Sequence, residues 1–257
     1  MSRVFITGSA DGLGRMAAKL LVEQGHRVVL HARHAARARE AMRAVAGAEQ
    51  ALTGDLSSID ETKALAAQVN ALGLFDAIIH NAGIGYRERA RGNTPDGLPR
   101  VFAVNTLAPY ILTALILKPA RLVYLGSSMH RSGDATLRDL EWKTRDWDGS
   151  QAYSDSKLHD VILAFAVAHR WPSVLSNAVD PGWVPTRMGG RGAPDDLAKG
   201  AETQAWLAVS DDPAARVSGE YFYHERPRAV HPAARDPHVQ RTLLEACAEI
   251  SGVALPA

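Results

Sequence analysis

A tyrosine and a lysine stand four positions apart in the segment QAYSDSKLHD (151–160), as Tyr153 and Lys157. On a helix, residues at i and i+4 are neighbours on one face. A nearby ammonium group favours the phenolate and lowers the tyrosine pKa from about 10. A phenol tuned toward neutral pH can give a proton to a carbonyl oxygen or take one from an alcohol. The same spacing also occurs by chance on solvated helix faces. Other parts of the sequence must therefore decide whether the pair is catalytic or only part of a solvated surface.

A glycine-rich turn, TGSADGLG (7–14), lies between the first predicted strand and the first predicted helix. Gly8, Gly12 and Gly14 permit a tight turn, a close approach of backbone to a pyrophosphate, and close packing of helix on sheet. The free N–H groups and the dipole at the start of the helix favour phosphate. The spacing is G-x-x-x-G-x-G rather than the common G-x-G-x-x-G. The context predicts a dinucleotide site, with an ordinary strand–helix turn as the alternative.

The end of the second predicted strand, VVLHARH (28–34), indicates which dinucleotide is bound. An acidic residue there would bind the ribose hydroxyls of NAD, whereas an arginine can accommodate the 2′-phosphate of NADP. Ala32 and Arg33 occupy this place and no carboxylate is near, so NADP is favoured over NAD. The alternative is that Arg33 is a plain surface charge, and the negative charge of Asp11 in the glycine turn argues mildly against a phosphate.

The third predicted strand is followed by GDL (54–56), which contains Asp55. This carboxylate has two possible partners. It can accept from the adenine amino group of a dinucleotide, or it can cap the helix that is predicted to begin near Ser57. The residues leave both interpretations open.

Strand-like and helix-like patterns alternate along the chain. The predicted strands are residues 3–7, 27–32, 50–54, 76–81, 121–127, 174–180 and 219–224. Apolar residues at helical spacing separate them, for example in GRMAAKLLVEQG (14–25), which ends at Gly25 as a helix should. Such alternation predicts a parallel sheet with helices on both faces. We therefore expect an α/β fold: one Rossmann-type doubly wound domain over residues 1–257, with a mostly parallel seven-stranded sheet.

Two segments interrupt the alternation, a polar insert at 129–150 and a Gly- and Pro-rich segment at 182–200. Long loops inside a compact domain often serve as lids or binding loops, so the second segment is predicted to be a substrate lid. The two segments carry apolar side chains that can line a pocket or pack locally, and arginines that can meet an anion or face water. These side chains are Trp142, Trp183, Val184, Met188, Arg187 and Arg191.

Composition narrows the possible partners. The 257 residues are 46% hydrophobic, and 29 Lys and Arg nearly balance 28 Asp and Glu, which gives no general attraction to nucleic acid or to an anionic membrane. The only cysteine, Cys247, excludes an internal disulfide and fits a reducing compartment. The first predicted strand leaves no room for a signal peptide, and the most apolar stretch, 107–117, is too short to span a bilayer. We expect a soluble cytoplasmic protein.

Taken together, the motifs resemble those of short-chain dehydrogenases/reductases, in the same order and over nearly the whole chain. The long separation between Ser127 and Tyr153, with the polar insert between them, resembles the retinol-dehydrogenase-like branch. The motifs that carry the resemblance are TGSADGLG (7–14), GDL (54–56), HNAG (80–83), Asn105 in VNTLAP, LGSS (125–128), YSDSK (153–157) and PGWVPT (181–186).

The resemblance implies a catalytic tetrad of Asn105, Ser127, Tyr153 and Lys157. Ser127 falls in register with the family's strand-then-serine pattern, and Ser128 is the alternative. The implied roles are Tyr153 as general acid/base, Ser127 as hydrogen-bond donor to the reacting oxygen, Lys157 at the nicotinamide ribose, and Asn105 as holder of a water. His130 and His159 are expected to be peripheral.

The predicted cofactor site combines the turn residues, the second-strand arginine and the family motifs, with Thr186 near the nicotinamide carboxamide. No metal is predicted. The expected cofactor-binding residues are Gly8, Ser9, Asp11, Gly12, Leu13, Gly14, Arg33, Asp55, Leu56, Asn81, Ala82, Gly83, Tyr153, Lys157, Pro181, Gly182, Val184 and Thr186.

The predicted function is an NADP-dependent oxidoreductase that moves hydride between nicotinamide and a small carbonyl or alcohol substrate. A non-catalytic NADP-binding redox sensor is the alternative, although such a protein would be expected to lose Tyr153 or Lys157. A sugar-nucleotide epimerase or dehydratase is disfavoured, because few residues remain after the last predicted strand for a substrate domain. The family also implies a possible homo-oligomer, with 107–117 as a candidate pairing helix.

Overall fold

Eight strands form one sheet in the computed structural model, which describes all residues from 1 to 257. The order across the sheet is β3-β2-β1-β4-β5-β6-β7-β8; all neighbours pair in parallel except β7 and β8, which are antiparallel. The expected α/β doubly wound fold is confirmed. The strands are β1 (Arg3–Ile6), β2 (Arg27–Ala32), β3 (Gln50–Thr53), β4 (Ala77–His80), β5 (Arg121–Leu125), β6 (Leu175–Asp180), β7 (Tyr221–Tyr223) and β8 (Arg226–Pro227).

The prediction of seven strands omitted β8. This strand has only two residues, too few to show any alternation of polar and apolar side chains. It is joined to β7 by a hairpin turn in which His224 and Glu225 both have positive φ, at 49° and 60°. Such turns usually carry Asn-Gly or Asp-Gly, so the sequence gives no hairpin signal here.

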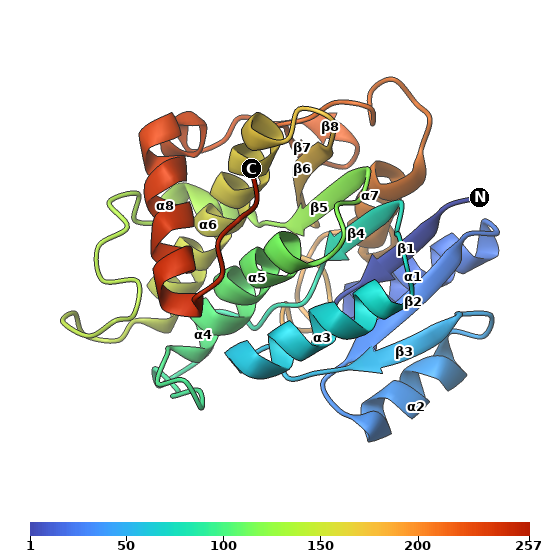
Figure 1. Ribbon diagram of the computed structural model, residues 1–257, viewed down its shortest axis with the longest axis horizontal. Helices are drawn as coiled ribbons and strands as arrows, with labels where there is room; N and C mark the ends of the chain where they lie inside the picture. The colour runs from blue at the N-terminus through green and yellow to red at the C-terminus, as the bar shows by residue number, and fades with distance from the viewer.

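Helices cover both faces of the sheet (Figure 1). The larger core lies between the sheet and α3, α5, α6 and α8, and the smaller core lies under α1, α2 and α7. In Figure 1, α3 and α5 lie in front of the sheet and α7 lies behind it. The helices are α1 (Gly12–Glu23), α2 (Ala35–Ala44), α3 (Ile59–Ala71), α4 (Arg100–Phe102), α5 (Ala108–Leu115), α6 (Gly149–Arg170), α7 (Leu197–Val209) and α8 (Pro237–Ser251).

Helix α1 ends as its sequence predicts and begins at Gly12, just before the predicted pattern 14–25. Asp11 is its N-cap, with a side-chain oxygen that accepts from the backbone N–H of Gly12 at 2.8 Å. Gly25 follows its last turn with φ of +81°, the left-handed conformation that ends many helices. The helix therefore points its N-terminus at the carboxyl end of β1, where a phosphate-binding turn is expected.

The strand order reverses between β1 and β4, which are neighbours in the sheet although β2 and β3 lie between them in sequence. Ligands of open α/β sheets bind at such a point, outside the carboxyl ends of the strands. The glycine-rich turn follows β1, the HNAG motif (80–83) overlaps the end of β4, and LGSS (125–128) overlaps the end of β5. The fold thus gathers three motifs at one edge of the sheet.

The apolar stretch 107–117 is mostly buried in the folded protein. Residues 108–114 are buried, and the Tyr110 hydroxyl donates to the carbonyl of Val253 at 2.8 Å, just beyond α8. Leu115 and Leu117 are exposed at the end of this stretch. Most of the stretch is therefore unavailable for pairing with a second copy, and self-association remains a prediction. No helix is both long enough and apolar enough to span a membrane.

Candidate active site

Tyr153 and Lys157 lie on one buried face of α6, as the four-residue spacing predicts. Asp148 caps this helix by accepting from the backbone N–H groups of Ser150 and Gln151. The Lys157 Nζ lies 5.6 Å from the centre of the Tyr153 ring. Both side chains are buried, so the pair does not decorate a solvated surface.

The pKa of Tyr153 is raised above its ordinary value, and the expectation that it is lowered toward neutral pH is wrong for the chain alone. Burial raises the pKa most, while Lys157 and a hydrogen bond with Ser127 lower it. The charges of Asp160 and Asp180 raise it further. Spacing alone identified the lysine, but it gave no indication of burial or of the two carboxylates.

Ser127 follows β5 and is the N-cap of a short 3-10 turn, η2 (Ser128–Ser132). Its side chain accepts from the backbone N–H of Met129 at 3.3 Å. Ser127 is also the serine whose hydroxyl lowers the pKa of Tyr153, whereas Ser128 is exposed. Both serines line the cavity beside Tyr153, and the effect on the pKa of Tyr153 favours Ser127 as the partner of the phenol.

Asn105 lies in a π-helical turn, η1 (Ala103–Leu107), just before α5. Its Oδ1 accepts from the backbone N–H of Ile84 at 2.8 Å, and its Nδ2 donates to the carbonyl of Ile84 and to the Ser156 hydroxyl, both at 3.0 Å. Asn105 therefore ties the loop after β4 to α6. π-Helical turns are rare and are frequent at functional sites.

Gly83 separates Asn105 from Lys157. A side-chain carbon at this position would lie 3.5 Å from Asn105 Oδ1 and 3.7 Å from Lys157 Nζ. Glycine thus leaves space that borders both polar atoms. This space is where the family resemblance expects a water held by Asn105.

The glycine-rich turn is built for close approach. Gly8 has φ of +65°, and a side-chain carbon there would lie 2.8 Å from Ala82 Cα; one at Gly14 would clash with the Asn81 side chain. His31 holds the turn in place, because its Nδ1 accepts from the Gly8 N–H at 2.9 Å while Nε2 contacts the Gly54 carbonyl. Burial lowers the pKa of His31 to about 4, which keeps the ring neutral and able to accept.

Most of the predicted cofactor residues line one cavity of about 340 Å³, within the usual size range for ligand pockets. Four do not. Ser9 is buried beneath the turn, Gly14 packs inside α1, and Gly182 and Val184 line an adjoining cavity. The predicted residues that do line the cavity are Gly8, Asp11, Gly12, Leu13, Arg33, Asp55, Leu56, Asn81, Ala82, Gly83, Tyr153, Lys157, Pro181 and Thr186.

The sequence prediction missed several residues of this cavity. The position of His31 near the end of the second strand could have indicated a cavity residue, since cofactor contacts are expected there. Arg187 gave a weaker indication, because it is an arginine in the predicted lid. The missed lining residues are His31, Gly54, Ile84, Val104, Leu125, Gly126, Arg187 and Met188.

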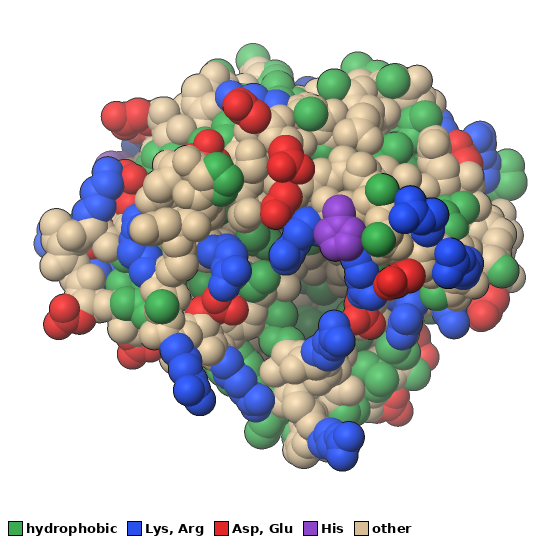
Figure 2. Space-filling view, turned by 90° about the horizontal axis from the view of Figure 1, so that it is seen from below, with side chains coloured by type: hydrophobic (Ala, Val, Ile, Leu, Met, Phe, Trp, Pro, Cys, Tyr) green, Lys and Arg blue, Asp and Glu red, His purple; other side chains and the backbone are tan.

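Three arginines surround Asp11 at the mouth of the cavity. The distances from its carboxylate to the nearest guanidinium nitrogen are 3.7 Å for Arg15, 3.4 Å for Arg37 and 3.6 Å for Arg187. Arg33 lines the same region. Lys and Arg side chains also stand around the hollow seen in Figure 2. The charge of Asp11, which argued against a phosphate, is thus outnumbered by cationic neighbours.

Asp55 makes a local turn in the structure. Its Oδ1 accepts from the backbone N–H of Ser57 at 2.9 Å and from the Ser57 hydroxyl at 2.8 Å. Helix α3 is capped instead by Ser58. Asp55 still lines the cavity, where its Oδ2 lies 3.9 Å from Arg33 Nε. It therefore shapes the loop that carries the cavity wall. The alternative that Asp55 caps α3 is wrong, and a contact with the adenine amino group remains a prediction.

A second cavity of about 290 Å³ adjoins the first and shares Tyr153 with it. Its walls are mainly apolar and come from Tyr86, Met129, Trp183, Val184 and Met188. The Tyr86 ring lies edge-on to the Tyr153 ring, with centroids 5.8 Å apart. An apolar pocket beside the phenol suits the non-reacting part of a substrate.

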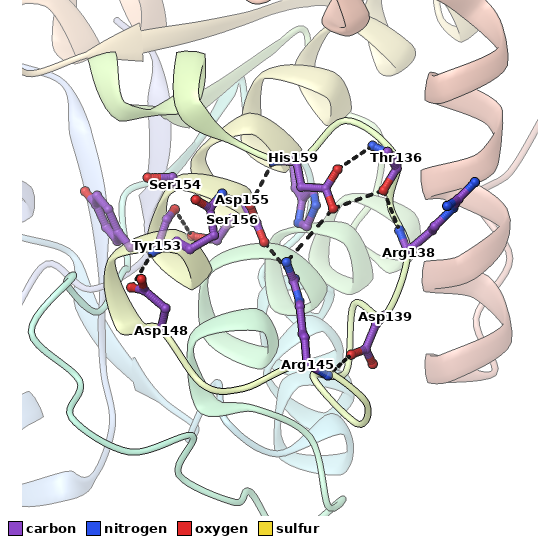
Figure 3. A network of polar contacts seen from close by, with 12 residues as sticks. Thr136, Arg138, Asp139, Arg145, Asp148, Tyr153, Ser154, Asp155, Ser156 and His159 are labelled. Atoms are coloured by element: carbon purple, nitrogen blue, oxygen red, sulfur yellow. Dashed lines mark hydrogen bonds and ion pairs between the residues drawn. The ribbon is translucent and has the colours of Figure 1, made fainter.

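Trp142 does not line this pocket and packs locally instead. Its ring lies 5.0 Å from the Trp147 ring, and the guanidinium of Arg145 lies over it at 3.6 Å. The Arg145 Nη2 also contacts the buried Asp155 carboxylate at 2.7 Å, which ties the insert to α6 (Figure 3). In Figure 3, Tyr153 points away from this ion pair, so the insert supports the helix from the side opposite to the phenol.

The two histidines near the tetrad make structural contacts. His130 Nδ1 contacts the Ser127 carbonyl at 2.7 Å, and its Nε2 accepts from the backbone N–H of His231. His159 Nδ1 contacts the Thr106 hydroxyl at 3.2 Å. No contact joins either ring to the Tyr153 hydroxyl, and the peripheral roles of both histidines stay a prediction.

The chain belongs to the short-chain dehydrogenase/reductase family, since residues 2–135 match the model for short chain dehydrogenase. It is 50% identical over 260 residues to the uncharacterized oxidoreductase AN7799 of Emericella nidulans, which covers 100% of this chain and 99% of that protein. It is 29% identical to human retinol dehydrogenase 13 over 98% of this chain and 85% of that protein. The chain is thus an oxidoreductase, and the resemblance to the retinol-dehydrogenase-like branch is confirmed.

Solved structures agree on the fold. An uncharacterized protein from Mycobacterium paratuberculosis is 25% identical to the chain and superposes with a TM-score of 0.86, covering 100% of this chain and 96% of that one. Pseudomonas aeruginosa RhlG, solved with NADP, is 23% identical with a TM-score of 0.68, and covers 87% and 96%. The same Rossmann-like fold therefore recurs in a protein that holds a nicotinamide dinucleotide.

Proposed function

We propose that this chain is an NADP-dependent carbonyl reductase or alcohol dehydrogenase in which Tyr153 is the general acid/base. The observation that carries the proposal is the place of Tyr153. Its side chain lines both the cavity fitted to a dinucleotide and the apolar cavity beside it. Only a group at this boundary can reach a substrate oxygen while the substrate carbon faces the cofactor.

The glycine cradle and the cavity lining fit a nicotinamide dinucleotide. The turn after β1 has no room for side chains at Gly8 and Gly14, and α1 points its N-terminus at the same place. Lys157 and Thr186 would hold the nicotinamide end, and Arg33 and Arg37 the adenosine end. When bound, the nicotinamide would supply or accept the hydride, which is the difficult part of the chemistry.

The protein side of the reaction is proton transfer and charge stabilisation. In reduction, the Tyr153 hydroxyl gives its proton to the carbonyl oxygen as the carbon receives hydride, and in oxidation the phenolate takes that proton back. The Ser127 hydroxyl donates a hydrogen bond to the same oxygen and stabilises its developing charge. Lys157 stabilises the phenolate that reduction leaves behind.

The space beside Gly83 supports the proposed route for the next proton. Asn105 Oδ1 and Lys157 Nζ both border it. A water there can accept from Lys157 and donate to Asn105, since the carbonyl oxygen of an amide accepts two hydrogen bonds. Asn105 is therefore proposed to be a positioning residue for this water.

The direct test is consumption of NADPH with a panel of aldehydes and ketones, with product alcohol measured alongside. Because the pocket beside Tyr153 is apolar, we expect aromatic and long-chain carbonyl compounds to be reduced with lower KM than short polar ones. The alternative, a redox-sensing module, predicts NADPH binding without turnover. A failure to reduce any member of the panel, with NADPH bound, would favour the sensor.

Cofactor choice gives a sharper prediction. An arginine contact to a 2′-phosphate is worth about 1.5–3 kcal/mol, and 1.4 kcal/mol is a factor of ten. We therefore expect kcat/KM to be about tenfold or more higher with NADPH than with NADH. The change Ala32→Asp with Arg33→Ala adds an acceptor for the ribose hydroxyls and removes a phosphate partner, so it should reverse this preference.

Arg37→Ala distinguishes the two nearby arginines. Arg37 contacts Asp11 at the cavity mouth, and Arg33 remains in place when Arg37 is replaced. The loss of Arg37 should therefore weaken NADPH use without creating a preference for NADH. Arg43, in the last turn of the same helix, lines neither cavity, and Arg43→Ala is the matched control. Equal or better use of NADH by the unchanged enzyme would reject the role of Arg33 and leave the oxidoreductase assignment standing.

The segment 182–200 is proposed to close over the bound ligands. It holds itself together through bonds such as Trp183 N–H to Asp195 Oδ2 at 2.6 Å and Gly190 N–H to the Thr186 carbonyl at 2.8 Å. Arg187 reaches Asp11 although its side chain is 91% exposed. The last residues of the segment, from Leu197, are already the first turn of α7.

We expect amide hydrogen exchange in residues 182–196 to slow on addition of NADPH with a carbonyl substrate. Exposed loops open at low free-energy cost, and ligand contacts raise that cost. The helix α8 lines neither cavity and serves as an internal reference whose protection should change less. Identical exchange of the segment with and without both ligands would argue against closure. Cytoplasmic location and self-association remain predictions.

A further inference from the structure

A buried carboxylate contacts the catalytic lysine, and the proposed chemistry does not use it. Asp160 Oδ2 lies 2.8 Å from Lys157 Nζ, and the two side chains are only 4% and 5% exposed. The same Nζ donates to the Leu125 carbonyl at 2.6 Å. Two of the three hydrogens of the ammonium are therefore directed by the protein, which leaves one for the cavity that Lys157 lines.

An unpaired charge inside a protein is costly, so buried charged side chains usually have a partner of opposite charge. The Lys157 ammonium would attract a phenolate at Tyr153 most strongly if no carboxylate were near. Asp160 offsets that positive charge from three residues along the same helix. The pair is neutral as a whole, so the phenol faces a weaker positive field than the lysine alone would give.

We propose that Asp160 is a positioning residue that fixes the Lys157 ammonium and, by offsetting its charge, keeps Tyr153 protonated to higher pH. This inference rests on the proposed function and refines it. A protonated Tyr153 is the form that reduces a carbonyl, because only the phenol can give a proton. Asp160 therefore biases the site toward reduction at neutral and alkaline pH.

The other groups around the pair act in the same direction or are engaged elsewhere. From β6, Asp180 also raises the pKa of Tyr153, but its oxygens accept from the Gly182 N–H at 2.9 Å and the Tyr221 hydroxyl at 3.1 Å. From β5, the Tyr124 hydroxyl shares a 2.7 Å hydrogen bond with Thr113.

On the η2 side, His130 is held by Ser127, and burial lowers its pKa. Asp160 is therefore the carboxylate that contacts the lysine directly.

The directions of the pKa shifts agree with this geometry. Burial acts to lower the pKa of Lys157, but Asp160 raises it and the net shift is upward. Burial raises the pKa of Asp160 to about 6 against the opposing effect of Lys157. Above pH 6 the carboxylate is charged and stabilises protons on both Tyr153 and Lys157. Below pH 6 it becomes neutral, and its influence disappears.

The test is the pH profile of carbonyl reduction in wild type and Asp160→Asn. The reduction rate falls at alkaline pH as Tyr153 loses its proton. Without the carboxylate, both buried groups lose protons more easily, so the midpoint of this fall should move to lower pH by about one unit or more. Asp160→Glu keeps the charge and should return the midpoint toward that of wild type. Below pH 6 the profiles of wild type and Asp160→Asn should have the same shape.

Asp155→Asn is the matched control. Asp155 is a second buried carboxylate on α6, but it pairs with Arg145 on the insert side. Its loss should leave the midpoint unchanged, whatever it does to stability. An unchanged midpoint in Asp160→Asn, or the same shift in both variants, would overturn the inference. If wild type reduces no carbonyl, the proposed function fails instead, so the two failures are distinguishable.

A second measurement does not need a folded Asp160→Asn variant. The ultraviolet difference between wild type and Tyr153→Phe during alkaline titration reports ionisation of Tyr153 alone. We expect its midpoint to lie above the ordinary tyrosine value of about 10 in the protein without cofactor. A phenolate that forms well below that value would contradict the role given to Asp160.

Discussion

The variant Tyr153→Phe should lose about 10²–10⁴-fold in kcat for carbonyl reduction and keep its affinity for NADPH. The change removes one hydroxyl and preserves the ring, which packs edge-on to Tyr86 with centroids 5.8 Å apart. Lys157 still contacts Asp160 and the Leu125 carbonyl, so the cavity keeps its shape. Steady-state rates and NADPH fluorescence titration measure the two quantities separately.

Tyr223→Phe is the control for Tyr153→Phe. Tyr223 lies on β7 and lines neither cavity, so removal of its hydroxyl should change kcat less than twofold, a limit of about 0.4 kcal/mol. If Tyr153→Phe kept more than about a tenth of the wild-type kcat, the loss of rate would be too small for removal of a general acid. Such a result would shift the proton transfer to another group.

The variant Lys157→Met should lose cofactor affinity, rate and stability together. It leaves the Asp160 carboxylate buried without a partner, and breaking a buried ion pair in this way costs about 3–5 kcal/mol. Because the pKa of Asp160 lies at about 6 even beside the lysine, the variant can relieve part of this cost by binding a proton. A carboxyl group whose pKa is raised in the folded state destabilises that state above its unfolded pKa. The deficit in unfolding free energy should therefore be larger at pH 8 than at pH 5.

A double variant separates stability from chemistry. Lys157→Met with Asp160→Leu removes both charges and fills the site with apolar atoms, which often costs little and can stabilise a protein. Denaturant unfolding should show recovery of most of the lost stability, while carbonyl reduction should stay as slow as in Lys157→Met. Recovery of the rate as well would mean that Lys157 acts only through folding.

The alternation of strands and helices determines most of the fold, and periodicity identifies it without any alignment. The seven longer strands lie where the sequence predicts them, because each is an apolar run bounded by turn or helix signals. The π-helical turn at Asn105 was not predictable, since residues 103–107 have an ordinary helical pattern. The family resemblance implied that Asn105 belongs to the site, but it gave no indication of the backbone conformation that presents this side chain.

Site residues that belong to local sequence motifs were predictable. Contacts between segments that are distant in sequence were less so. The turn after β1 and the Tyr153–Lys157 pair are local, so their positions follow from spacing. Arg37 and Arg187 meet at Asp11 only because α2 and the segment 182–200 fold over the same cavity mouth.

Trp142 is a residue for which the sequence left two alternatives open. An aromatic residue in a long loop can line a pocket or pack locally, and contacts with Arg145 and Trp147 show that Trp142 packs locally. Burial of Asp160 was equally hidden, since a charged residue on a helix is usually exposed.

The central claim is that this site transfers hydride between nicotinamide and a carbonyl carbon, and isotope transfer tests it most directly. The enzyme would be incubated with NADPH carrying deuterium at the transferable C4 position and with the carbonyl panel, and each alcohol product analysed by mass spectrometry and NMR. We expect deuterium on the carbinol carbon of the product, none at that carbon when deuterium is supplied only by the solvent, and no labelled product with Tyr153→Phe over the same time. Bound NADPH with no label transferred to any carbonyl compound, or label transferred equally fast by Tyr153→Phe, would contradict the claim.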